Sequence, residues 1–323
     1  MLKSVISLAI ASFAACATIS GLAAQEYPTR TVTIINAFGA GGPIDAYARP
    51  MAQKLSEWMG QSFVVESMPG ASGIIAAQYV KRAKPDGHTL LIIANTHTTN
   101  ETLNPGRNYV LMKDFKPVTQ LFASDHGMFV NSKLPVNSVS DLISLAKKEP
   151  GKLTFASSGP GSTYHLATEL FKIRAGVDML HVPYKASTQA RTDVISGQID
   201  MFFDLTGSLA EQAKVGQVRL LATTGKQRSP IRPDVPTAEE AGLKDFDVEA
   251  WGILMAPAGT PDDVIQKLYE NISRFMKSPE GQETAKRQGM RQPGGTPAET
   301  GAFLDSEIQK WGDVVKAAKI SIQ

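Results

Sequence analysis

The chain has 323 residues, of which 42% are hydrophobic and 20% are charged, and its formal net charge is +2. This is the composition of a globular protein, and the length allows two domains because single cores stop growing near about 250–300 residues. The sequence contains no basic run, which argues against nucleic acid as a partner. Cys16 is the only cysteine, so disulfides and thiolate metal sites are excluded. No cofactor is expected.

The first 24 residues have the pattern of a secretory signal peptide. Lys3 provides a positive start, residues 5–22 are apolar or small and uncharged, and small residues precede Gln25 at the expected cleavage site. A single membrane anchor is the alternative, but the abundance of Ala, Ser and Thr favours export with cleavage. The sequence therefore predicts an exported protein, and the family resemblance described below implies that it is periplasmic.

Two segments of the chain share one plan, in which a strand is followed by a glycine-rich turn and a helix. Strand-like residues 31–37 lead into FGAGGPID at 38–45, and strand-like residues 153–156 lead into SSGPGSTYH at 157–165. Such a turn directs free backbone N–H groups and the positive end of the helix dipole at one point. Two such loops, in successive α/β domains, predict a cleft that holds a small anion from both sides.

The first loop does not fit the nucleotide-binding patterns. Ile44 stands where a dinucleotide loop needs Gly or Ala, and no Gly-Lys-Ser/Thr follows. We expect Gly42 to be the N-cap of the next helix and Pro43 its first residue, where a missing N–H costs nothing. Asp45 then lies in the first turn, where it either offsets the dipole or accepts a donor group of the ligand.

The second loop places Ser162 as an N-cap, with Thr163 and His165 in the first helical turn. Ser158 and His165 suggest a nucleophile and a base. However, the sequence positions no carboxylate to orient the imidazole and contains no G-x-S-x-G elbow. A neutral His165 that donates one hydrogen bond at the cleft edge is the preferred interpretation. The histidine spacings do not indicate a metal site.

Strand-like and helix-like segments alternate along the rest of the chain, which is typical of α/β layers. The segment NTHTTN at 95–100 is expected to be a polar loop after a buried strand at 88–94. Further strands are expected at 63–66, 181–184, 201–203 and 218–224, and helices at 74–83, 138–149, 187–196, 262–277, 280–288 and 298–316.

Two long extended runs, at 118–130 and 248–256, suit a polypeptide that crosses twice between two lobes. Residues 25–125 and 249–323 would form lobe 1, and residues 126–248 would form lobe 2. Trp251 lies within the second run, so its surroundings should change when the lobes move. Trp58 and Trp311 are expected on helices remote from this hinge.

The two loops and several other segments resemble the solute-binding proteins of tripartite tricarboxylate transporters, also called the Bug family. Besides FGAGGPID, the matching segments are YPTR (27–30), VVESMPGASG (64–73), AKPDGHTLL (83–91), SSGPGSTYHL (157–166), HVPYKAS (181–187), DVPTAEEAG (234–242) and APAGTP (256–261). They occur in the family's order over nearly the whole mature chain. The resemblance implies an α/β fold with two lobes, the type II periplasmic binding protein fold, in which each lobe is a mixed sheet flanked by helices.

The same resemblance implies a non-enzymatic receptor that closes on a small organic carboxylate, held mainly by backbone N–H groups, hydroxyls and water. It would deliver this ligand to a membrane permease, or present it to a sensor kinase, and a monomer is expected. The residues that the resemblance and the loop analysis assign to the ligand are Phe38, Gly41, Gly42, Pro43, Ile44, Asp45, Asn95, Thr96, His97, Ser157, Ser158, Gly159, Gly161, Ser162, Thr163, His165, Tyr184 and Asp204.

Ile44 stands where the family often has a polar residue, so a ligand with an apolar or aromatic body, or a dicarboxylate such as a terephthalate-like acid, is favoured over citrate. Two other functions remain open at this stage. One is an enzyme on the same two-lobed fold, a dehydratase or a transferase that acts on a carboxylated substrate. The other is an adaptor whose cleft is empty.

Overall fold

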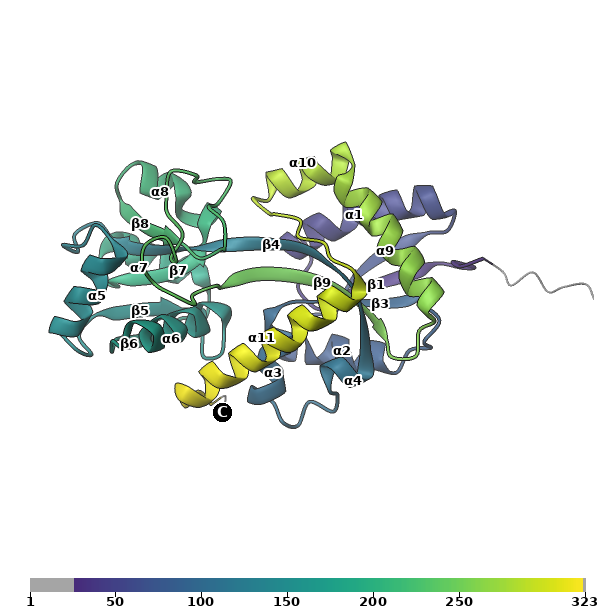
Figure 1. The fold of residues 1–323 in the computed structure, drawn as a ribbon, viewed down its shortest axis with the longest axis horizontal. Helices are drawn as coiled ribbons and strands as arrows, with labels where there is room; N and C mark the ends of the chain where they lie inside the picture. The colour runs from purple at the N-terminus through teal and green to yellow at the C-terminus, as the bar shows by residue number, and fades with distance from the viewer. Residues whose placement is uncertain (1–25, 322–323) are drawn as a thin grey trace, which may run out of the picture.

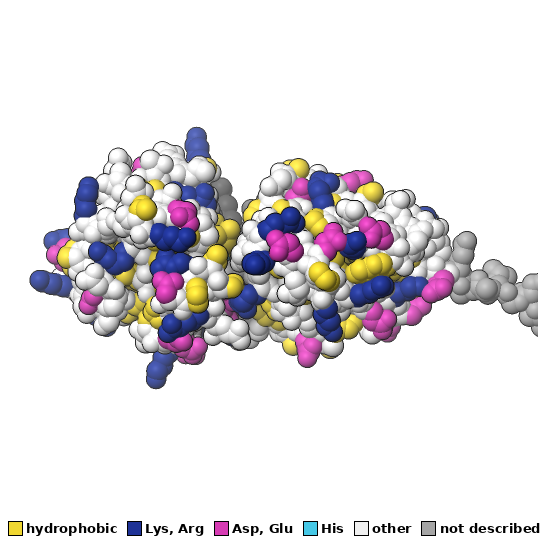
Figure 2. Space-filling view, turned by 90° about the horizontal axis from the view of Figure 1, so that it is seen from above, with side chains coloured by type: hydrophobic (Ala, Val, Ile, Leu, Met, Phe, Trp, Pro, Cys, Tyr) yellow, Lys and Arg dark blue, Asp and Glu magenta, His cyan; other side chains and the backbone are white. Residues whose placement is uncertain are grey.

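The computed structural model describes residues 26–321, so the predicted signal peptide and Cys16 lie outside the described residues. Figure 1 shows two lobes connected by the long strands β4 and β9, and Figure 2 shows the same two masses separated by a waist. Acidic and basic side chains are interspersed over the face in Figure 2. None of the helices within residues 26–321 has the length and apolar character needed to cross a membrane.

Lobe 1 is built around the strand order β2-β1-β3-β9-β4. Its strands are β1 (Val32–Asn36), β2 (Phe63–Ser67), β3 (Thr89–Ile93), β9 (Glu249–Pro257) and the first part of β4 (Phe115–Asn131). Its helices are α1 (Pro43–Met59), η1 (Ala71–Gly73), α2 (Ile74–Lys81), α3 (Asn95–Leu103), α4 (Leu111–Asp114), α9 (Asp262–Lys277), α10 (Pro279–Arg287) and α11 (Pro297–Ala317).

Helices cover both faces of this sheet. Its parallel strands can therefore bury apolar residues at successive positions. On β1, Ile34 packs into the cluster formed with α1 and α9, whereas its neighbour Ile35 packs into the cluster formed with α2. Adjacent side chains of a strand point to opposite faces, so the two isoleucines serve two separate cores. The three-layer arrangement holds the carboxyl end of β1, and the loop that follows it, in a fixed place.

Lobe 2 is built around the order β4-β7-β5-β6, with β8 also paired to β4. Its strands are β5 (Thr154–Ser157), β6 (Leu180–Pro183), β7 (Met201–Leu205) and β8 (Val218–Thr223). Its helices are α5 (Val139–Lys148), α6 (Thr163–Ala175), α7 (Ser187–Ser196), η2 (Thr206–Leu209) and α8 (Ala210–Lys214). Strands β5, β6 and β7 are parallel, whereas β4 runs antiparallel to β7 and β8. Each lobe is therefore a mixed sheet flanked by helices, as predicted.

The two predicted extended runs are strands, and they connect the lobes. β4 pairs with β9 from Phe115 to Asp125 and then continues into lobe 2, where it pairs with β7 and β8 from His126 or Gly127 onward. The chain returns to lobe 1 through β9, whose first residue, Glu249, lies opposite Asp125. The crossing point is thus a pair of antiparallel strands.

Helix α11 also links the lobes, which corrects one expectation. Its Leu304 lies in the lobe 1 core with Trp251, whereas Trp311 and Val315 lie in the lobe 2 core with Phe203. Trp311 was expected to be remote from the hinge, and that prediction was wrong. Trp58 does lie elsewhere, with the Arg274 guanidinium 4.1 Å from its ring centroid.

Residues 95–100 were predicted to be a loop, and this prediction was also wrong. They begin α3, which packs against α11 and buries Asn95, His97 and Thr98. Its sequence has no apolar periodicity and few good helix formers, so local propensity does not indicate a helix. Packing in the interior of lobe 1 overrides that propensity.

Candidate functional site

A cavity of about 230 Å³ lies where the two lobes meet, and three helix N-termini reach it. Gly42 and Pro43 come from the start of α1, Asn95 and Thr96 from the start of α3, and Thr163 from the start of α6. The rest of its lining is mostly apolar: Phe38, Gly39, Ile44, Ala94, Phe122, Ser124, Leu205, Ala250, Trp251 and Met290. The positive ends of three helix dipoles in an apolar cavity suit one small anion.

The first loop has the predicted cap geometry. Gly42 is the N-cap of α1, Pro43 is its first residue, and no side chain caps the helix. Because the first-turn N–H groups have no intrahelical acceptor, they are free to donate to a ligand. Gly41 has a φ of +77°, a conformation in which side chains are strained, so glycine is required there.

Asp45 is held within the loop in this structure. Its Oδ2 accepts hydrogen bonds from the Gly41 N–H at 3.0 Å and from Arg49 Nε at 2.8 Å. Arg49 lowers the pKa of this carboxyl below its ordinary value, and the Gly41 N–H adds to the effect. The Asp45 side chain is 6% exposed, and these contacts within the first turn fit the structural role at the helix N-terminus rather than contact with a ligand.

The second loop is held by two stacked histidines. Ser162 caps α6 by accepting the His165 N–H at 3.3 Å, which confirms the predicted cap. The Gly161 N–H donates to His165 Nδ1 at 3.1 Å, and the His165 ring stacks on His181 with centroids 3.9 Å apart. Burial lowers the pKa of His165 to about 4, so its ring is neutral at pH 7. His165 here accepts a backbone hydrogen bond rather than lying free at the cleft edge.

Ser157 forms the other contact of this support. Its Oγ lies 2.7 Å from His181 Nε2 and accepts the Gly159 N–H at 3.0 Å. A serine beside a histidine resembles a nucleophile and its base, but Ser157 has no exposed surface. Its hydroxyl shapes the turn and is not accessible to a substrate in this structure.

Helix α3 contributes the polar groups that sequence reasoning placed on a loop. The Thr96 hydroxyl is buried and has no hydrogen-bond partner among the described residues. An unpaired buried hydroxyl is costly, so Thr96 is a natural donor or acceptor for a ligand in the cavity that it lines. His97 lies behind it, fully buried, where burial lowers its pKa to about 4.

The predicted site residues divide into two groups in the structure. Those that line the cavity are Phe38, Gly42, Pro43, Ile44, Asn95, Thr96 and Thr163. Those that do not line it are Gly41, Asp45, His97, Ser157, Ser158, Gly159, Gly161, Ser162, His165, Tyr184 and Asp204. Asp204 is paired with Arg191, and the Tyr184 hydroxyl donates to Asp193 at 2.6 Å.

Sequence reasoning missed four lining residues in particular: Phe122, Ser124, Leu205 and Met290. Phe122 and Ser124 lie on β4, Leu205 ends β7, and Met290 follows α10. No motif marks them, because they reach one cavity only through the crossing of β4 between the lobes. Among residues 26–321, no group of three or more His, Cys, Asp or Glu is placed to hold a metal ion.

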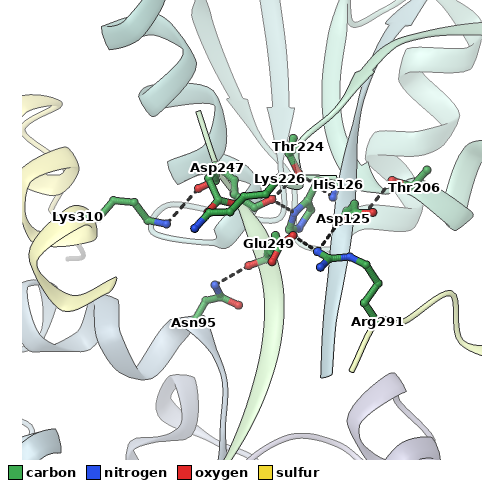
Figure 3. Close-up of polar contacts among 11 residues, drawn as sticks. Asn95, Asp125, His126, Thr206, Thr224, Lys226, Asp247, Glu249, Arg291 and Lys310 are labelled. Carbon is green, nitrogen blue, oxygen red and sulfur yellow. Dashed lines mark hydrogen bonds and ion pairs between the residues drawn. The ribbon is translucent and has the colours of Figure 1, made fainter. Parts of the chain in front are cut away.

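The hinge beside the cavity contains a cluster of partly buried charges, drawn in Figure 3. Arg291 contacts the carboxylates of both Asp125 and Glu249, which face each other across β4 and β9. Burial raises the pKa of Glu249 to about 7, although Arg291 opposes this shift. Gly225 of lobe 2 lies so close to the cluster that a Cβ added there would be 2.2 Å from Asp125 Oδ1, so a side chain does not fit.

Asn95 connects the cavity with this hinge. Its Nδ2 donates to the Glu249 carbonyl at 2.8 Å, and its Oδ1 accepts the Trp251 N–H at 3.2 Å. The side chain therefore bridges the start of α3 and the start of β9. It thereby connects the lining of the cavity with the strand that crosses between the lobes.

Comparison with known proteins places this arrangement in a family. The family model described as "Tripartite tricarboxylate transporter family receptor" matches residues 47–320. The chain belongs to this family. The predicted resemblance is thereby confirmed, and the two-lobed fold is shared with solved structures of family members.

Three of these structures are similar over almost their whole length. Rpa4515 of R. palustris, solved with adipate, is 36% identical and has a TM-score of 0.76, covering 91% of this chain and 99% of its own. The periplasmic binding protein BugD is 31% identical, with a TM-score of 0.73 and coverages of 92% and 100%. MatC (Rpa3494) of Rhodopseudomonas palustris, with bound malate, is 32% identical, with a TM-score of 0.72 and coverages of 90% and 100%. Two of these three structures thus contain a carboxylate, adipate in one and malate in the other.

Proposed function

We propose that this chain is a periplasmic receptor that captures a small organic carboxylate between its lobes and delivers it to the permease of a tripartite tricarboxylate-type transporter. The observation that carries the proposal is the convergence of the α1, α3 and α6 N-termini on one apolar cavity. Adipate and malate in two related structures support the ligand class.

The lining predicts how the carboxylate is held. None of the described residues around this cavity is Lys or Arg, so backbone N–H groups and the Thr96 hydroxyl would bind the anion without a salt bridge. Phe38, Phe122 and Trp251 surround the remaining volume. Such a wall favours an aliphatic or aromatic body, because polar ligand groups would lack partners there.

An enzyme on the same fold would need a free acid or base in the cleft. The sequence offered Asp45, His165 and Asp204, and each already has a partner: Arg49, the Gly161 N–H and Arg191, respectively. Asp45 and Asp204 are therefore poorly suited to proton transfer, and His165 is stacked behind the second loop. These contacts support binding without turnover.

Calorimetry and thermal shift with a panel of mono-, di- and tricarboxylates test the proposal. A ligand at 100 times its dissociation constant should stabilise the native state by about 2.7 kcal/mol. Gly42→Val should abolish binding, because its side chain would occupy the approach to the α1 N-terminus. The far-UV spectrum should be unchanged, since φ is −75° and a Cβ there meets only the Gly39 carbonyl oxygen, at 3.4 Å.

Gly106→Val is the matched control, since no atom lies within 4 Å of a Cβ at that position. It should bind like the wild type. Wild-type affinity in Gly42→Val would remove the first loop from the site, and steady conversion of a bound carboxylate to product would favour the enzyme.

A further inference from the structure

A second cavity, of about 270 Å³, lies next to the first. The two share four lining residues: Pro43, Ser124, Leu205 and Met290. The second cavity extends from them toward η2 and the loop after α10, where Ser208 and Gln288 lie. Apart from Pro43, none of its lining residues belongs to a glycine-rich loop, and no sequence motif indicated it.

The volumes favour one ligand in both cavities. Ligand pockets commonly have volumes of about 300–1,000 Å³, and each cavity alone falls below that range whereas the pair reaches it. Met290 and Leu205 line both, together with Pro43 and Ser124, and this mostly apolar boundary between the cavities is called the neck below. A ligand whose carboxylate lies at the helix N-termini would pass this neck and place its far end in the second cavity.

The residues that line the second cavity determine which chemical group it can hold at the far end of the ligand. Hydrogen-bonding side chains are present in Ser124, Ser208 and Gln288, and Asp125 adds a carboxylate. None of its lining residues within the described chain is Lys or Arg.

The nearby guanidinium groups are already paired. Arg191 binds the Asp204 carboxylate and donates to Ser208 Oγ at 3.0 Å. Arg291 binds the carboxylates of Asp125 and Glu249. A second ligand carboxylate here would lie near the Asp125 carboxylate without a free cation, and the like charge would oppose its binding.

We infer that this receptor selects an elongated carboxylate whose far end is an uncharged hydrogen-bonding group, such as a hydroxyl or an amide, and discriminates against a second carboxylate. The inference rests on the proposed function, because the first carboxylate must occupy the helix N-termini. It narrows the ligand class, since dicarboxylates are then weaker ligands. The far end is recognised by Ser208 and Gln288, and the neck of Met290 and Leu205 favours a methylene chain between the two ends.

Calorimetry at pH 7.5 with a matched six-carbon series tests this directly. Hexanoate, 6-hydroxyhexanoate and adipate share one chain and differ only at the far end. The hydroxy acid should bind at least ten times more tightly than either of the others. Equal or tighter binding of adipate or hexanoate overturns the inference, as does the absence of binding by all three.

A gain of function gives an independent check. Gln288→Arg supplies the missing cation in the second cavity and should tighten adipate binding at least tenfold. Gln288→Met, of similar length and without charge, should not. An unchanged adipate affinity in Gln288→Arg would show that the far end does not reach this wall.

Gly207→Leu tests the cavity itself. Gly207 lines it, and a Cβ there meets only Ile231 Cδ1, at 3.5 Å, so the larger side chain should fill the space without forcing the backbone. It should weaken 6-hydroxyhexanoate at least ten times more than it weakens propanoate. Equal effects on both acids overturn the inference.

The same experiments distinguish failure of this inference from failure of the proposed function. If adipate binds best and Gly42→Val abolishes its binding, the carboxylate receptor stands and only the inference about the far end fails. If no carboxylate of the wider panel binds, both fail.

Discussion

Trp251 and Trp311 donate their indole N–H groups to the same carboxylate oxygen, Glu307 Oε2, at 3.0 Å and 2.9 Å. Trp251 belongs to β9, whereas Trp311 and Glu307 belong to α11, and all three are buried. Lys310 also pairs with Glu307. The Glu307 carboxylate therefore connects β9, which crosses between the lobes, with helix α11.

Replacing this carboxylate should destabilise the fold. Glu307→Leu leaves two buried indole donors without an acceptor, and each costs about 1–3 kcal/mol. We expect a loss of about 2–5 kcal/mol in urea unfolding, with an unchanged m-value. Asp305→Leu, on the exposed side of the same helix, should stay within about 0.5 kcal/mol of the wild type. Similar losses in both variants would contradict a specific role for Glu307.

Ligand binding should change tryptophan fluorescence through this pair. Trp251 lines the cavity, and its partner Trp311 shares its acceptor, so both emission environments respond. Trp251→Phe should remove most of the ligand-induced shift and Trp311→Phe part of it. Trp58→Phe should leave the shift intact, because Trp58 packs against Arg274 on α9. A shift that disappears only with Trp58 would refute this assignment.

Removing the side-chain cap of α6 should lower the stability of the protein while leaving the helix in place. Ser162→Ala leaves the His165 N–H without its side-chain acceptor and should cost about 1 kcal/mol. Thermal unfolding measures this, and Ser162→Asp, which keeps an acceptor at the N-cap, should recover most of the loss. If Ser162→Asp and Ser162→Ala unfold at the same temperature, the cap contributes little to stability.

The buried histidines predict a fall in stability at acid pH. Burial lowers the pKa of His97 to about 4, whereas the unfolded chain has the ordinary value near about 6.5. Between these values the unfolded state binds a proton and the native state does not, so stability decreases as pH falls from about 6.5 to about 4. The loss from one such histidine is about 2 kcal/mol at pH about 5, at 1.36 kcal/mol per pH unit.

Urea unfolding between pH 7.5 and 4.5 measures that slope. His97→Gln should flatten it, and His165→Gln should do the same because its pKa is also lowered to about 4 by burial. A slope that neither substitution changes would assign the acid loss to other groups.

Binding should also bring the lobes together about Asp125 and Glu249, where β4 and β9 cross. Small-angle scattering should then show a smaller radius of gyration with saturating ligand. An unchanged radius together with an unchanged Trp251 signal would indicate a rigid, preformed cleft.

Most of the fold could be predicted from the sequence, because the signals were local. The strand, glycine turn and helix plan placed Gly42 and Ser162 as caps, and the long β-like runs indicated the crossing strands β4 and β9. These features follow from backbone conformations that particular residue types favour over a few positions.

The site could be predicted only in part, because convergence is not local. Met290 and Leu205 are 85 residues apart in the numbering, and they line one cavity only through the crossing of β4. Helix α3 has a polar sequence whose helicity depends on burial against α11. The sequence indicated that Asn95 and Thr96 contribute polar groups to the site. It did not indicate that they lie at the N-terminus of a helix, α3.

The placement of α11 in both cores makes the two lobes depend on the same segment of the chain. Lobe 1 receives Leu304 and lobe 2 receives Trp311 and Val315, so neither interior is complete without residues beyond position 300. A chain synthesised from its N-terminus thus keeps both interiors unfinished until its last helix emerges. One helix thus completes the interiors of both lobes, so removing it would expose apolar surface in each of them.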